Sequence, residues 1–185
     1  MVGPDKLVRV ERLQKADIRR ALESLAAALP PTRSPRELWL VGGAAMVLLY
    51  DARESTKDVD AFSLEPGETL AIRTAAAAVA SRLGLPDDWL NDGAKGYVHG
   101  LAPGEALLEM PGLLVRAAAP PQLLAMKLSA WRDDLDVADA RLLLSKIPGD
   151  RESVWGRVER HLVPGRELKA RYAFDDLWEA DREPA

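Results

Sequence analysis

Apolar residues recur along this chain with two different spacings, and these spacings predict the secondary structure. Intervals of three and four residues indicate amphipathic helices, whereas strict alternation or a short apolar run indicates a strand. Helices are predicted over residues 6–29, 44–50, 69–83, 120–131, 133–146, 151–162 and 167–178. Strands are predicted over residues 38–41, 58–62, 106–110 and 113–117.

Proline and glycine mark the ends of several of these elements. Pro30 and Pro31 stop the first helix, because proline lacks a backbone N–H and clashes with the preceding turn. Gly84 suits the residue that closes a helix in the left-handed conformation, and Pro120 suits a first helical turn. The strands therefore fall in the first two thirds of the chain, and only helices follow them.

This order of elements predicts an α+β fold, with a small mixed sheet flanked by helices and a helical C-terminal half. A length of 185 residues suits one domain, with at most a small helical appendage. We expect a core over residues 1–118, including the N-terminal helix, and a helical region over residues 119–185 that packs on this core.

Composition narrows the chemistry that the chain can perform. Without any cysteine, the chain has no disulfide, thiol nucleophile or cysteine-bound metal, and it has only two histidines. Any metal ion must therefore be held by carboxylates. The net charge of −4 argues against general binding to polyanions. Residues 1–36 nevertheless carry eight Lys or Arg against four acidic residues, so a local basic face is one reading of this segment and an ordinary solvated helix is the other.

The hydropathy pattern also bears on location. No apolar run approaches the ~20 residues that a membrane span requires, and the start of the sequence has no apolar signal segment. We therefore expect a soluble cytoplasmic protein that has no membrane partner.

The segment over residues 38–62 combines features of phosphate and metal chemistry. Gly42 and Gly43 separate a predicted strand from a predicted helix, where backbone N–H groups and the positive end of the helix can hold a phosphate. Asp58 and Asp60 lie two residues apart on a predicted strand, so their side chains project from one face. A divalent cation would relieve their repulsion, and Mg²⁺ binds such carboxylates together with substrate phosphates. The intervening helix and loop can return the chain to an adjacent strand, beside the glycines.

A lysine on a later helix also calls for an anion. Lys127 is the only charged residue in the apolar run over residues 123–130. A buried ammonium without a partner is costly, so Lys127 should face a carboxylate or a phosphate, unless its long side chain reaches the surface. Asp139 on the next predicted helix is a candidate partner.

The glycine turn, the helix and the Asp-x-Asp strand, which read GGAAMVLLYDAR and then STKDVDAF, resemble the signature of the nucleotidyltransferase superfamily related to DNA polymerase β. Within it, the chain resembles bacterial nucleotidyltransferase-like proteins of the AbiEii type, which include toxins of toxin–antitoxin pairs. The segment LLAMKLSAWRDDLDVADARLLL also resembles that family, so the likeness spans about residues 38–144.

The resemblance implies a role for each matching residue. Gly42 and Gly43 would cradle the triphosphate of an NTP, Asp58 and Asp60 would hold two Mg²⁺ ions, and Lys127 would reach the triphosphate or the base. Asp139, with Asp136, would correspond to the acidic substrate-binding positions that follow the lysine. Apart from the resemblance, Arg53 and Lys57 are candidates for binding the substrate phosphates, and an ordinary surface or paired charge is the alternative for each.

The sequence departs from the family pattern at two points. The family often has a serine where Gly43 stands, so backbone amides would have to replace its hydroxyl group. Active members also carry a third carboxylate on a later strand, for which Glu109 is the candidate, with Glu105 behind it.

The implied activity is a Mg²⁺-dependent transfer of a nucleoside monophosphate from an NTP to an acceptor hydroxyl. The expected acceptor is an RNA, the 3′ end of tRNA, and the expected partner is an antitoxin. The alternatives are transfer to a small molecule or a protein, and a non-catalytic regulatory member that only binds nucleotides.

Two roles are open for Trp89. It either lines the nucleotide pocket, with Tyr97 as a stacking partner, or holds its own loop in place.

Overall fold

A computed structural model describes residues 12–131 and 133–180 of the chain. The strands are β1 (Leu13–Gln14), β2 (Arg36–Leu40), β3 (Ser55–Thr56), β4 (Val59–Ser63), β5 (Leu90–Asn91), β6 (Pro103–Met110) and β7 (Leu113–Ala118). The helices are α1 (Lys15–Ala28), α2 (Gly42–Tyr50), α3 (Thr69–Leu83), α4 (Pro120–Ala130), α5 (Asp134–Ser145), α6 (Arg151–Glu159) and α7 (Glu167–Ala180). Two 3₁₀ helices, η1 (Pro66–Glu68) and η2 (Gly93–Tyr97), complete the described elements.

Five of the strands form one mixed sheet in the order β5-β4-β2-β7-β6. β2 runs antiparallel to β4 and parallel to β7, β5 runs parallel to β4, and β6 runs antiparallel to β7. The remaining strands, β1 and β3, form a small antiparallel pair that joins the N-terminal segment to the loop after α2. The predicted α+β class and mixed sheet are confirmed.

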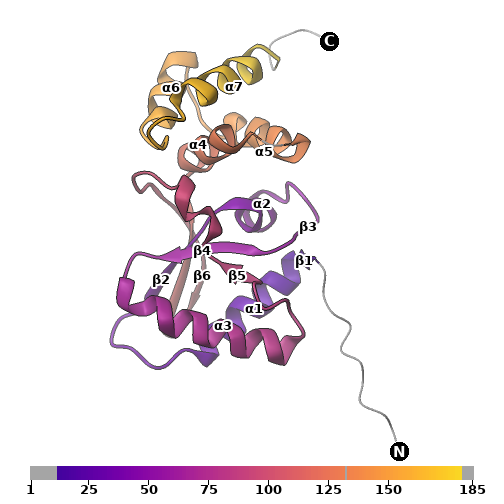
Figure 1. Ribbon diagram of the computed structural model, residues 1–185, viewed down its shortest axis with the longest axis vertical. Coiled ribbons are helices and arrows are strands. Elements are labelled where there is room, and N and C mark those ends of the chain that lie inside the picture. The colour runs from indigo at the N-terminus through magenta and orange to yellow at the C-terminus, as the bar shows by residue number, and fades with distance from the viewer. Residues whose placement is uncertain (1–11, 132, 181–185) are drawn as a thin grey trace, which may run out of the picture.

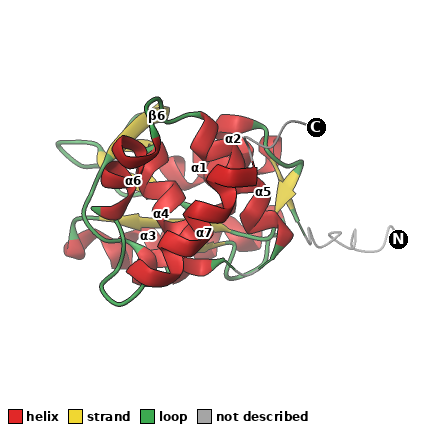
Figure 2. Cartoon of the chain, turned by 90° about the horizontal axis from the view of Figure 1, so that it is seen from above, coloured by secondary structure: helices red, strands yellow, loops and turns green. Residues whose placement is uncertain are grey.

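Helices cover both faces of the sheet (Figure 1). α1 and α3 lie on one side, where they pack with Leu38, Leu40 and Val59 in one hydrophobic core. The four C-terminal helices stack on the other side, where they share a second core with Trp39 and Phe62. Seen from above, these four helices lie over the strands (Figure 2). α2 contributes side chains to both cores and so lies where the two layers meet.

Local sequence explains where these elements begin and end. Gly84 has a φ of 66° and closes α3 with a hydrogen bond from its N–H to the carbonyl of Ala80, as a left-handed cap requires. Pro120 occupies the first turn of α4, where its missing N–H has no cost. Asp133 and Asp150 cap α5 and α6 by accepting backbone hydrogen bonds from the residues three positions later.

The differences from the predicted elements are small. The first helix was predicted to begin at residue 6, but it begins at Lys15, after the short strand β1. Residues 6–11 of the predicted range lie outside the described residues. Strands β1, β3 and β5 were not predicted, because two residues are too few to set up a period. Pairing with distant strands, rather than local pattern, makes these segments extended.

Candidate functional site

A cavity of about 530 Å³ opens between the sheet and the C-terminal helices. Its walls come from the start of α2, the loop before β4, β4 itself, β5 with η2, and the facing sides of α4 and α5. Its charged lining residues are Arg12, Arg53, Lys57, Asp58, Asp60, Lys127, Asp133 and Asp136. Four cationic and four anionic side chains thus meet around one cavity.

Asp58 and Asp60 both lie at this cavity, on either side of Val59. Val59 is fully buried in the core that faces α1 and α3, so the period of the strand turns both carboxylates to the opposite side. The carbonyl of Asp60 also accepts a hydrogen bond of 3.0 Å from the N–H of Val41, which ties the end of β2 to β4. The structure therefore brings the Asp-x-Asp pair beside the glycine turn.

Gly42 must be a glycine for two independent reasons. Its φ is 62°, in the left-handed region that residues with a side chain rarely adopt. In addition, a Cβ atom there would lie 2.6 Å from Oδ2 of Asp60, which is too close for any real contact. The absence of a side chain lets the carboxylate of Asp60 approach the first turn of α2.

Four charged side chains form a buried network in the wall opposite the sheet. Nζ of Lys127 lies 2.8 Å from Oδ1 of Asp136 and 2.7 Å from Oδ2 of Asp139. Arg53 forms an ion pair with the same oxygen of Asp139. Within the described part of the chain, two cations and two anions thus pair here, as buried charges require. The expected pairing of Lys127 with Asp139 is confirmed.

Members of this network differ in their access to the cavity. Arg53, Lys127 and Asp136 line it, whereas Asp139 does not and is only 3% exposed. Asp139 therefore pairs with Arg53 and Lys127 without lining the cavity itself. The sequence had instead predicted that Asp139 contacts the substrate directly. Lys57, in contrast, is exposed at the cavity.

Asn91 is a cavity residue that the sequence analysis did not single out for a role. Asn91 lies on β5, in register with Asp60 on the neighbouring strand β4. Its Nδ2 donates a hydrogen bond of 3.0 Å to Oδ2 of Asp58. Its Oδ1 accepts a hydrogen bond of 2.8 Å from the N–H of Gly93. An Asn before an Asp-Gly turn was the available signal. Because β5 has no period of its own, its place beside β4 could not be inferred.

Arg12 is a second cavity residue that was missed. Its Nε donates a hydrogen bond of 2.9 Å to Oγ of Ser55, and its Nη2 contacts the carbonyl of the same residue. The pairing of β1 with β3, with Leu13 opposite Thr56, brings this arginine to the cavity. A cation near the N-terminus is thus held against the loop that carries Arg53 and Lys57.

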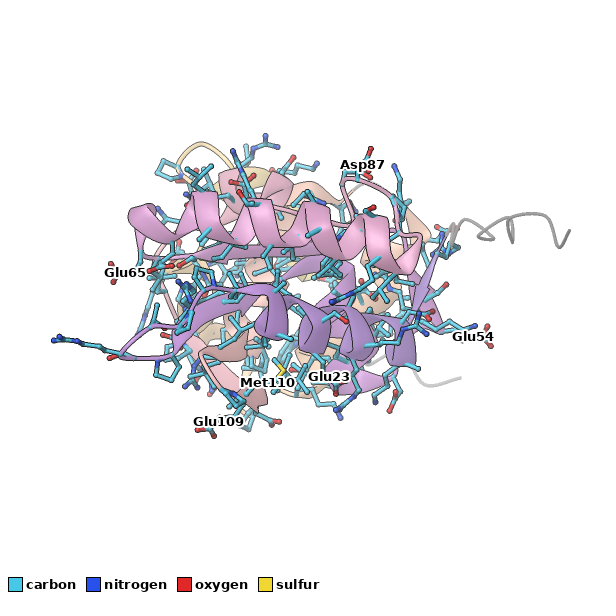
Figure 3. All side chains as sticks on the ribbon, turned by 90° about the horizontal axis from the view of Figure 1, so that it is seen from below. Glu23, Glu54, Glu65, Asp87, Glu109 and Met110 are labelled. Carbon is cyan, nitrogen blue, oxygen red and sulfur yellow. The ribbon has the colours of Figure 1, made fainter. Side chains whose placement is uncertain are left out.

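The assignment of Glu109 as a third carboxylate is wrong on geometric grounds. Glu109 is exposed on β6, and β2 and β7 separate this edge strand from β4. Neighbouring strands lie about 4.8 Å apart, so three strand spacings separate β6 from β4. Glu109 also projects outward at the edge of the molecule (Figure 3) and does not line the cavity.

Glu105, the second candidate for the third carboxylate, also lies away from the cavity. It is exposed on β6, and its negative charge helps to raise the pKa of Tyr50, although burial of the phenol is the larger cause of this rise. Tyr50 ends α2, whereas the glycines begin it, and a helix of nine residues is about 13 Å long. Glu105 therefore lies near the end of α2 that is remote from Gly42 and Gly43, and it does not line the cavity.

The structure distinguishes between the two roles considered for Trp89. Trp89 is fully buried, and its indole N–H donates a hydrogen bond of 3.0 Å to the carbonyl of Ala76 on α3. It holds its loop in place and does not line the cavity. Tyr97 does line the cavity, together with apolar side chains from α4, and the guanidinium of Arg166 lies 5.4 Å from its ring centre.

The donor set of the cavity suits a hard cation only in part. Two carboxylates on one face, with room for phosphate oxygens, are chemically appropriate for Mg²⁺. Within residues 12–131 and 133–180, however, no three acidic or histidine side chains gather to hold a metal ion. Oxygen ligands from a bound substrate would have to complete the coordination.

Comparison of the chain with protein-family models, with curated proteins and with solved structures gives no match. Of the helices that the structure describes, none has both the length and the apolar character that crossing a bilayer demands.

Proposed function

We propose that this chain is a nucleotidyltransferase that transfers a nucleoside monophosphate from an NTP to an acceptor hydroxyl. The observation that carries the proposal is the placement of Asp58 and Asp60 at one mixed-charge cavity, with the carboxylate of Asp60 against Gly42. The order of a strand, a glycine turn, a helix and an Asp-x-Asp strand supports a nucleotidyltransferase-like fold.

Each part of the cavity has a place in this chemistry. The acceptor oxygen would form a bond to the α-phosphorus while the bond to the β-phosphate breaks, and pyrophosphate would leave. Asp58 and Asp60 would hold Mg²⁺, which supplies charge neutralisation to the triphosphate when bound. Arg53 and Lys57 would orient the phosphates, because cations stabilise the charge that develops on them.

The apolar wall suits the nucleoside. Tyr97 on η2 and the side chains of Leu123 and Met126 on α4 give the cavity an aromatic and apolar wall. Bound bases stack on aromatic rings and pack on apolar side chains. We place the base on this wall and the triphosphate toward α2.

The expected acceptor is the 3′ end of an RNA. Arg12 and Lys57 are exposed at the cavity, where they can contact acceptor phosphates. A tRNA acceptor, a role as a toxin and an antitoxin partner form part of this proposal. Incubation with each labelled NTP and separate pools of tRNA, other RNA, protein and small molecules distinguishes RNA transfer from its alternatives.

The central test replaces either aspartate by asparagine, which removes charge but preserves shape. Asp58→Asn and Asp60→Asn should each reduce incorporation of the labelled nucleotide by at least a hundredfold, with an unchanged circular dichroism spectrum. Asp88→Asn serves as the matched control, because Asp88 is exposed and does not line the cavity. Full activity in either active-site variant would refute the proposal.

A non-catalytic nucleotide-binding protein is the second candidate, and one observation favours it. Asn91, rather than a carboxylate, stands beside Asp60 on the adjacent strand. The two candidates differ in turnover: a binding protein would show a thermal shift with NTP and Mg²⁺ but would release no pyrophosphate over any acceptor pool.

A further inference from the structure

The space beside Gly43 is filled by a threonine hydroxyl. A Cβ atom placed on Gly43 would clash with Oγ1 of Thr56 and would lie 3.2 Å from its Cβ. The φ of Gly43 is not in the left-handed region, so its backbone conformation would accept a side chain. Gly43 is therefore a glycine because Thr56 needs the room, a different reason from that at Gly42.

Thr56 is a buried polar residue at the cavity. It is 5% exposed, lies on β3 and is held in place by the pairing of β3 with β1, opposite Leu13. It lines the cavity, and no hydrogen bond joins its hydroxyl to any residue that the structure describes. Most polar groups of buried residues have a hydrogen-bond partner, so this hydroxyl is available to a ligand in the cavity.

The surroundings of this hydroxyl favour an anion. Nη1 of Arg53 lies 3.4 Å from the same point beside Gly43. The first turn of α2 begins there, with N–H groups that have no partner within the helix and a partial positive charge. A hydroxyl, a guanidinium and helix N–H groups from three different segments thus converge.

We propose that the Thr56 hydroxyl is a phosphate ligand, which donates a hydrogen bond to the triphosphate tail of the bound nucleotide. The site takes phosphate oxygens of a nucleoside triphosphate, with Arg53 and the N-terminal N–H groups of α2 as the other donors. Asp60 approaches Gly42, whereas Thr56 and Arg53 approach Gly43, so the carboxylate and the proposed phosphate donors meet different residues of the glycine turn. This assignment rests on the proposed nucleotidyltransferase function and adds a specificity-determining residue to it.

The first test separates the hydroxyl from the rest of the side chain. Thr56→Val keeps the shape of the side chain, and it should weaken binding of the preferred NTP with Mg²⁺ by roughly tenfold to a hundredfold, as for a hydrogen bond to a charged group. Thr56→Ser should recover most of this affinity. Thr74→Val is the matched control, because Thr74 is exposed on α3, on the opposite face of the sheet.

Isothermal titration calorimetry measures the affinity for the NTP and for the corresponding nucleoside. The affinity for the nucleoside should not change in Thr56→Val. A structural role for Thr56 would instead weaken the nucleoside and the NTP alike. Equal NTP affinity in Thr56→Val and in the wild type would overturn the assignment of Thr56 but leave the proposed transfer intact. If the wild type binds none of ATP, CTP, GTP and UTP, both the assignment of Thr56 and the proposed transfer would be overturned.

A swap of the two residues gives the second test. Gly43→Ser alone should lose NTP affinity, because its Cβ would displace Thr56. The double variant Gly43→Ser with Thr56→Ala returns one hydroxyl to the same space from the other side, and it should bind NTP at least fivefold more tightly than either single variant. Affinities that simply combine the two losses would contradict the shared-space assignment.

Discussion

Nδ2 of Asn91 lies 3.0 Å from Oδ2 of Asp58, and this hydrogen bond joins β5 to the residue that precedes β4. Replacement of Asn91 by Asp would remove the donor and add a third negative charge beside Asp58 and Asp60. Like charges at this distance repel, so Asn91→Asp should unfold several degrees lower than the wild type in EDTA. Added Mg²⁺ should raise its melting temperature more than that of the wild type, because three carboxylates bind a divalent cation more tightly than two.

Two further variants control this prediction for charge and for shape. Thr74→Asp adds the same charge on the exposed face of α3 and should show no additional Mg²⁺ response. Asn91→Ala removes the bonds to Asp58 and to Gly93 without adding charge, so it should lose stability at every Mg²⁺ concentration. A Mg²⁺ response of Asn91→Asp no larger than that of the wild type would contradict the metal role of this carboxylate pair.

Gly42 and Gly112 offer a matched pair of glycines. Both have positive φ, 62° and 81°, so alanine at either position should cost about 1–2 kcal/mol of folding free energy in backbone strain. Only at Gly42 does the new Cβ meet a functional group, since nothing lies within 4 Å of a Cβ at Gly112. Gly42→Ala should therefore also displace Asp60 and abolish nucleotide transfer, whereas Gly112→Ala should remain active.

Urea unfolding and nucleotide incorporation, measured on both alanine variants, check this expectation. Loss of activity in Gly112→Ala would show that strain alone impairs the enzyme. Retained activity in Gly42→Ala would show that Asp60 does not need its close approach to α2.

Much of this fold follows from local pattern. The predicted range of α3, residues 69–83, matches the observed helix, because its apolar spacing and its closing glycine act within the segment itself. The Asp-x-Asp strand and the glycine turn were likewise recognisable, since period and turn chemistry are local properties. The strand β5 has only two residues, and its extended form depends on pairing with β4.

The candidate site shows the same division. Asp58, Asp60 and the glycines could be predicted from spacing, and Lys127 from its charge in an apolar run. The third carboxylate was misplaced to Glu109, because sequence order does not reveal that β2 and β7 lie between β6 and β4. Asn91 and Arg12 reach the cavity through pairings between segments that are distant in the chain, which no local pattern reports.

Two lysine–aspartate pairs allow the buried network to be tested against an exposed pair. Lys127 interacts with two aspartates that are each 3% exposed, whereas Lys15 interacts with the exposed Asp51 at 2.7 Å. Loss of one partner of a buried ion pair costs about 3–5 kcal/mol, because the remaining charge stays buried and unpaired. An exposed pair contributes about 0–1 kcal/mol. Lys127→Met should therefore destabilise the protein far more than Lys15→Met.

Chemical denaturation of both methionine variants measures the difference. A double variant, Lys127→Met with Asp136→Leu, removes one of the two carboxylates that lose the ammonium and should regain part of the lost stability. Equal losses in Lys127→Met and Lys15→Met would mean that solvent reaches the network and that Asp136 and Asp139 do not need the ammonium.

The boundary near residue 118 separates two segments that cannot be functionally independent, because the cavity uses both. Asp58 and Asp60 lie before the boundary, whereas Lys127 and Asp136 lie after it. The core on this face also spans the boundary, since Trp39 and Phe62 on the sheet pack in the same cluster as the C-terminal helices.

A truncated chain of residues 1–118 would expose both aromatic side chains. Burial of each side chain contributes about 1.5–3 kcal/mol, against a typical stability of about 5–15 kcal/mol. We expect the truncated chain to show no cooperative thermal transition, and the full chain to unfold in a single one. A cooperative transition in the truncated chain, at a temperature near that of the full chain, would show instead that the C-terminal helices complete the site without stabilising the sheet.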